Sequence, residues 1–93
     1  MTQPRAGFKL FLGGSHEHNE ALRLAVSRHL QDAFGNDYEL TVVELKSQPG
    51  IGAAEQILAT PTLLRTFPGP QRRVVGDLHS KYLLTQALLF DIT

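Results

Sequence analysis

The stretch ILATPTLLRTFPGPQRRVVGD, residues 57–77, decides most of the fold. Two strand-like runs, the apolar residues 61–67 and the residues 71–77, flank the turn Pro68-Gly69-Pro70. Proline and glycine between two such runs predict an antiparallel β-hairpin. Immediately before the hairpin, Pro61 follows a segment with a helical pattern, so the sequence predicts a sharp change of chain direction at this proline.

Strand and helix patterns alternate over the first half of the chain. The apolar run 8–14 ends in two glycines and predicts a buried strand. Residues 15–36 predict a helix, capped at its start by Ser15 or Asn19, and residues 38–46 predict a second strand. Apolar residues recur every four positions in the helix: Leu22, Val26, Leu30 and Phe34. This unit predicts a right-handed crossover that joins two parallel strands.

Two further helices are expected after the second strand. Residues 51–58 predict a short helix that buries Ile51, Ala54 and Leu58 on one face. Residues 78–92 predict a terminal helix, capped by Asp77 or Ser80, with a stripe of Leu83, Leu84, Ala87 and Leu88. The order β-α-β-α-β-β-α is that of a thioredoxin-like α/β domain with a four-stranded mixed sheet and helices on both faces. In that fold Pro61 is expected to be cis.

Composition restricts the classes of function. The 93 residues fit one domain, which we assign to residues 8–93, with residues 1–7 as a flexible arm. Nine basic and nine acidic residues cancel, which argues against nucleic acid or a membrane surface as partner. The polar N-terminus and the lack of an 18-residue apolar run indicate neither a signal peptide nor a membrane span, so we expect a cytoplasmic protein.

Candidate catalytic and metal sites are weak. The chain has no cysteine, which excludes the thiolate chemistry of thioredoxins. His16, Glu17 and His18 open the first helix; we interpret them as a solvated helix start, with a metal-assisted thioredoxin-related enzyme as the alternative. No catalytic motif stands out. We therefore expect no enzyme activity, no cofactor and no metal site, and a structural role for the loop at Pro61.

One basic cluster remains. Arg65 and the pair Arg72 and Arg73 lie on the two strands of the predicted hairpin, where Arg65 and one of the pair would share a face. The cluster either contacts a partner or forms a solvated edge that discourages aggregation.

The same stretch resembles the KaiB family of bacterial clock proteins. ILATPTL, a proline-rich turn, a basic pair and VVGDL follow the family pattern in order, and KLFLGG and YELTVVELKSQPG resemble its first two strands. The resemblance runs from about Phe8 to Phe90. It departs from the pattern at Gln56 and Thr41, which replace lysines, and at the turn, which has Gly69 in place of a proline.

The resemblance implies a non-enzymatic adaptor that binds a KaiC-type ring ATPase and modulates its activity or the access of other partners, such as a KaiA-like protein or a histidine kinase. A detached sensory domain for a histidine kinase is the alternative. By family motif, the ATPase-facing residues are Gly50, Glu55, Gln56, Ala59 and Pro61. The family's acidic tail is not found here, which favours a stress-adaptation pathway over a clock.

The family also implies two folds, a thioredoxin-like monomer and a βαββααβ form that is usually tetrameric. Ala87 stands where relatives have glycine, and glycine costs a helix interior about 1 kcal/mol relative to alanine. Leu89 replaces an acidic residue and adds apolar surface. We therefore expect the thioredoxin-like form, with the other fold, and a homo-oligomer such as a dimer or tetramer, as alternatives.

Overall fold

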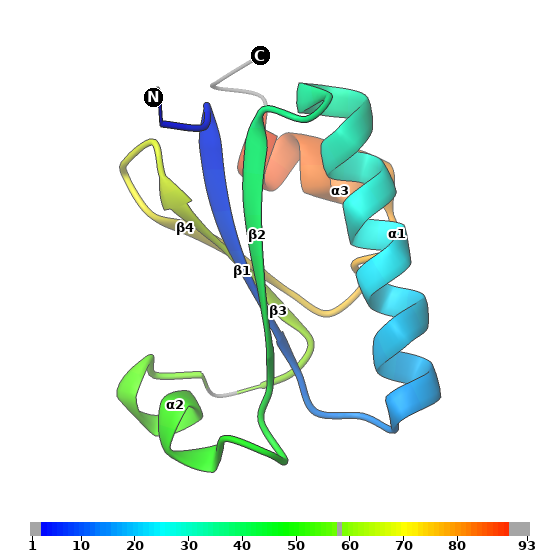
Figure 1. Ribbon diagram of the computed structural model, residues 1–93, viewed down its shortest axis with the longest axis vertical. Helices are drawn as coiled ribbons and strands as arrows, with labels where there is room; N and C mark the ends of the chain where they lie inside the picture. The colour runs from blue at the N-terminus through cyan, green and yellow to red at the C-terminus, as the bar shows by residue number, and fades with distance from the viewer. Residues whose placement is uncertain (1–2, 58, 90–93) are drawn as a thin grey trace.

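The computed structural model describes residues 3–57 and 59–89, and it has the predicted order of elements. The strands and helices are β1 (Ala6–Leu12), α1 (His16–Phe34), β2 (Tyr38–Glu44), α2 (Pro49–Ala54), β3 (Thr62–Phe67), β4 (Arg72–Val75) and α3 (Lys81–Leu84), after which a π-helical turn, η1 (Thr85–Leu89), continues α3 (Figure 1). The thioredoxin-like fold class is thereby confirmed.

The strands form one mixed sheet in the order β2-β1-β3-β4. β1 is parallel to β2 and antiparallel to β3, and β3 pairs antiparallel with β4, so the predicted crossover and hairpin are both present. β1 starts at Ala6 rather than at Phe8, because Ala6 pairs with Tyr38 and is fully buried. Two residues assigned to the N-terminal arm, Ala6 and Gly7, therefore belong to the sheet.

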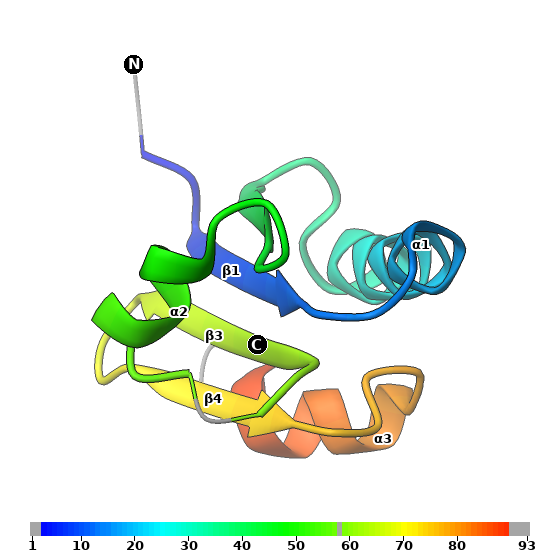
Figure 2. The ribbon, with the colours of Figure 1, turned by 90° about the horizontal axis from the view of Figure 1, so that it is seen from below.

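The two faces of the sheet are covered unequally. α1 and α3 lie on one face and the short α2 lies on the other (Figure 2). The main core, between the sheet and α1 with α3, holds Phe8, Leu10 and Leu12 of β1 and the predicted stripe of α1. On the α2 face a smaller cluster contains Phe11, Val43 and Leu64.

The structure shows which of the two candidate residues caps the start of α1 and which caps the start of α3. Ser15 Oγ accepts a hydrogen bond from the His18 backbone N–H at 3.2 Å and caps α1. Ser80 Oγ accepts from the Leu83 N–H at 3.2 Å and caps α3. Asp77 instead accepts from the His79 N–H, just before the helix. Each serine satisfies one N–H that the first helical turn leaves without a partner.

The predicted position of the short second helix is wrong. α2 starts at Pro49 and ends at Ala54, and Ile51 and Ala54 are exposed rather than buried. Gly52 is buried instead, and a Cβ built on it would lie 3.4 Å from Leu45 Cδ2. At Gly52, α2 therefore packs against Leu45, the residue that follows β2. Leu58, the third expected core residue, lies outside the described residues.

The terminal helix is confirmed as far as Leu89, but its buried stripe differs from the prediction. Leu84 and Leu88, four residues apart, are buried, whereas Leu83 is 45% exposed. Leu78 is also fully buried, although it precedes the helix. The side chain of Ala87 and the predicted end of the helix at residues 90–92 lie outside the described part of the chain.

The turn from α2 into β3 contains two special backbone conformations. Gln56 has φ 58°, in the left-handed region, and the Thr60–Pro61 bond is cis, as predicted. A left-handed residue other than glycine is strained, and β-branched residues tolerate this conformation least.

A first prediction uses this strain. Gln56→Val is expected to lower the free energy of unfolding by about 1–3 kcal/mol, and Gln56→Gly to leave it unchanged or to raise it by up to about 1 kcal/mol. Gln31, inside α1, is the control, since glycine there should cost about 1 kcal/mol. Urea unfolding measures all three. A loss for Gln56→Gly as large as that for Gln31→Gly would contradict the left-handed turn.

A second prediction tests the rotation of the terminal helix. Leu84→Ala should destabilise the protein by about 2–5 kcal/mol, because Leu84 is 1% exposed and its loss leaves a cavity in the core. Leu83→Ala, the matched control one residue earlier, should cost less than about 1 kcal/mol. Thermal or urea unfolding measures both. Equal or reversed losses would show that the helix faces the sheet differently.

Candidate functional site

The five residues named from the family motif come together at one end of the molecule. Gly50 lies in α2, Glu55 and Gln56 follow it, and Ala59 and Pro61 lie in the turn into β3, at the bottom of Figure 1. Gly50, Gln56 and Ala59 are exposed, and Glu55 and Pro61 are half-buried. We call these five residues the α2 surface. α2 itself lies on the sheet face opposite α1 and α3 (Figure 2).

Glu55 is already paired within the chain. Its carboxylate lies 2.9 Å from Nζ of Lys9 on β1, and both side chains are about one-third exposed, at 33% and 38%. A pair this accessible contributes at most about 1 kcal/mol. Its main effect is to direct the carboxylate toward the sheet, so Glu55 orients the end of α2 and presents little free negative charge.

A second cation supports the same turn. Arg73 Nη1 donates a hydrogen bond to the carbonyl oxygen of Gln56 at 3.3 Å. Leu64 of β3 pairs with Lys9 of β1 on one side and with Arg73 of β4 on the other. Lys9 and Arg73 are therefore aligned across three neighbouring strands, and both side chains lie on the α2 face of the sheet. Two basic side chains, from β1 and β4, thus contact the residues that follow α2.

The turn at Pro61 is fixed by hydrogen bonds on both sides. Thr62 Oγ1 donates to the Ala59 carbonyl at 2.6 Å, and the Gly76 N–H donates to the Pro61 carbonyl at 3.1 Å. Thr60 Oγ1 also lies so close to Gly13 that a Cβ there would be only 2.6 Å away. The loop is therefore tied to β1, β3 and the end of β4.

Beside Pro61, a pocket of about 180 Å³ lies between the end of β1 and the start of α1. Asn19, almost fully buried in its wall, accepts from the Gly14 N–H at 3.1 Å and donates to the Gly14 carbonyl at 3.2 Å. Through these two hydrogen bonds, the side-chain amide of Asn19 holds the β1–α1 loop in place. The pocket lining is Leu12, Gly13, Gly14, His18, Asn19, Leu22, Thr60 and Pro61, in which no nucleophile is hydrogen-bonded to a base.

The positions of the side chains give no support to a metal site at the start of α1. His16, Glu17 and His18 are all exposed at the start of α1. Among residues 3–57 and 59–89, no three histidine, cysteine, aspartate or glutamate side chains are grouped so as to hold a metal ion.

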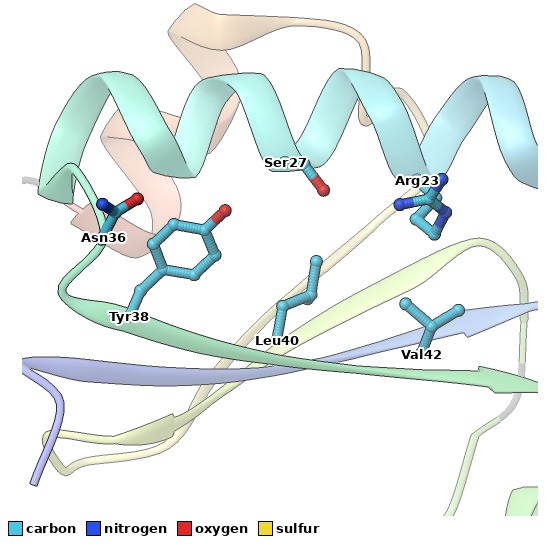
Figure 3. A pocket seen from close by; sticks show the side chains of 6 residues that line it. All are labelled: Arg23, Ser27, Asn36, Tyr38, Leu40 and Val42. Atoms are coloured by element: carbon cyan, nitrogen blue, oxygen red, sulfur yellow. The ribbon is translucent and has the colours of Figure 1, made fainter.

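A larger groove, of about 390 Å³, runs between α1 and the edge strand β2 (Figure 3). Tyr38, Leu40 and Val42 point from the strand toward the helix, and Arg23, Ser27 and Asn36 complete the lining. Arg23 bonds to both carboxylate oxygens of Glu20, at 3.2 and 2.8 Å, and this holds the pKa of Glu20 below its ordinary value. This groove was not predicted from the sequence, where its signal is the alternation at Tyr38, Leu40 and Val42.

The expected basic cluster is not a surface patch. Arg65 is fully buried, because it pairs with Phe8 of β1 and shares its orientation toward the main core. Arg72 pairs with Arg65 and lies on that face, whereas Arg73 lies on the α2 face. The expectation that Arg65 and one of the pair share a face is confirmed, but the expectation that they form an exposed basic cluster is wrong.

No described helix is both long and apolar enough to cross a membrane.

Comparison with known proteins agrees with this fold. The N-terminal domain of Synechococcus elongatus SasA superposes with a TM-score of 0.69 at 21% identity, over 97% of this chain and 88% of that domain. A designed protein superposes with a TM-score of 0.68 at 17% identity, over 91% of this chain and 75% of its own. Both identities are low, so these matches establish the fold alone.

Sequence comparison identifies the family. The model of the KaiB domain matches residues 9–89. A circadian clock oscillator protein KaiB from Prochlorococcus marinus subsp. pastoris is 35% identical over 85 residues, which cover 89% of this chain and 79% of that protein. The corresponding protein of Rippkaea orientalis is 32% identical over 89% of this chain and 82% of its own length. The chain belongs to the KaiB family.

Proposed function

We propose that this protein is a non-enzymatic adaptor that docks on a KaiC-type ring ATPase through the α2 surface and modulates the activity of that ATPase or its access to other partners. One observation carries the proposal. The residues that match the family motif, though spread over twelve positions of sequence, lie together on an exposed end of the domain. Membership of a family whose curated relatives are named clock oscillator proteins supports it.

The chemistry of the α2 surface suits protein docking. Exposed residues around it are small or apolar: Gly50, Ile51, Ala53, Ala54 and Ala59. Ile51 is 36% exposed and is the largest apolar side chain in this set, so it can act as an anchor in a partner pocket. Because the Glu55 carboxylate is paired with Lys9, docking over the five small or apolar residues removes little unpaired charge from water.

The wider pathway is part of the same proposal. The fold shared with the SasA N-terminal domain supports competition between two proteins of one fold for one surface on the ATPase. We place the protein in the cytoplasm, in a clock or stress-adaptation pathway, and keep a KaiA-like protein or a histidine kinase as possible second partners. Homo-oligomers, dimeric or tetrameric, remain the proposed alternative to a monomer.

Binding to the ATPase tests the proposal directly. The purified protein would be incubated for a day with the KaiC homologue of the same organism, in ATP and separately in ADP, and analysed by size-exclusion chromatography. A complex in at least one nucleotide state is expected. No complex in either state, at concentrations of each protein well above micromolar, would refute it.

Two substitutions locate the interface. Ala59→Asp and Gln56→Glu each place a negative charge on the α2 surface, and each should weaken binding at least tenfold, about 1.4 kcal/mol. The matched controls are Ala21→Asp and Gln31→Glu, which make the same changes at exposed positions of α1. Biolayer interferometry measures all four dissociation constants, with circular dichroism to show that each variant is folded. Equal effects at the two sites would place the interface elsewhere.

A further inference from the structure

Arg65 is a charged side chain inside the core, and docking through the α2 surface does not explain it. It is fully buried in β3, directly after Leu63 and Leu64, which are themselves buried. A guanidinium in an apolar interior is strongly unfavourable unless its N–H groups are hydrogen-bonded. The acceptors that it contacts therefore indicate what it does.

Two of its acceptors lie in separate parts of the described chain. Arg65 Nη1 donates to the carbonyl oxygen of Leu88 at 2.7 Å, in η1, which continues α3. Nη2 donates to the carbonyl oxygen of Pro70 at 3.2 Å, in the turn between β3 and β4. One side chain thus links the sheet, the hairpin turn and the end of the terminal helix.

The two ends of the terminal helix are attached in different ways. The polar contacts near its start are exposed: a bond between His29 and the His79 carbonyl at 3.2 Å and the Lys81–Asp32 pair at 3.3 Å, which lie beside the buried Leu78 and Leu84. Such surface contacts contribute little. At its end, the Arg65–Leu88 bond is short, buried and charge-assisted, which makes it the stronger kind of attachment.

We propose that Arg65 is a latch that holds residues 81–89 on the sheet, and that without it this segment undocks while β1, α1 and β2 stay folded. α1 packs its own apolar stripe against the sheet, so the N-terminal half keeps most of its core when the terminal helix leaves. Units that open locally in this way are common in small domains. Undocking would remove Leu84 and Leu88 from the core cluster and expose part of the apolar surface of that cluster.

Hydrogen–deuterium exchange with mass spectrometry tests the latch without any binding partner, so its outcome is independent of the proposed function. Arg65→Met removes the donors and keeps an unbranched apolar chain, and Arg65→Lys keeps the charge with a single donor group. Arg73→Met is the matched control, because Arg73 lies on the same hairpin, is exposed and faces α2.

For Arg65→Met, amides of residues 81–89 should exchange at least tenfold faster, and amides of β1 and α1 should change less than twofold. Arg65→Lys should give a smaller, equally local effect, and Arg73→Met none over residues 81–89. Uniform acceleration throughout the chain, or no change over residues 81–89, would overturn the proposal. If Arg65→Met fails to fold, the pattern for Arg65→Lys decides; failure of both to fold also overturns it, since the loss would then be global.

Discussion

Burial of β1 on both faces is the constraint on which the rest of the structure depends. Phe8, Leu10 and Leu12 face the main core, Phe11 faces the α2 side, and both edges of the strand are paired. A strand with apolar side chains on both faces is stable only when a helical layer covers each face. α1 supplies one layer and also carries the chain back to place β2 parallel to β1. The terminal helix and α2 then complete the two sides.

The unequal layers explain the location of the proposed docking surface. The main core is closed by the 19 residues of α1 together with the terminal helix, whereas the other face has only the six residues of α2. A helix this short is not stable by itself, and Lys9 and Arg73 hold the two residues that follow it, Glu55 and Gln56. The α2 surface is therefore the thinnest part of the fold, where a partner can add the contacts that the chain lacks.

The sequence predicted the parts of the fold that local patterns determine. α1 has an unbroken stripe from Leu22 to Phe34, and the hairpin has a proline–glycine turn, so both were recognised. α2 was misplaced because its packing depends on a tertiary contact, Gly52 against Leu45, that no periodicity reveals. Arg65 was expected at the surface because arginine is seldom buried. Its burial depends on a hydrogen bond to the Leu88 carbonyl, 23 residues later in the chain, which local sequence cannot reveal. The groove beside β2 was missed because its lining requires the strand order.

The central claim is that the last described segment is a helix that covers the main core, and that the described residues form a sheet of four strands. Backbone chemical shifts of the isotopically labelled protein in solution test it most directly, because Cα and Cβ shifts distinguish helix from strand residue by residue. The account predicts helical shifts from Lys81 to Leu89, with extended shifts confined to the four strands. Extended shifts over residues 81–89, together with helical shifts within β3 or β4, would contradict it.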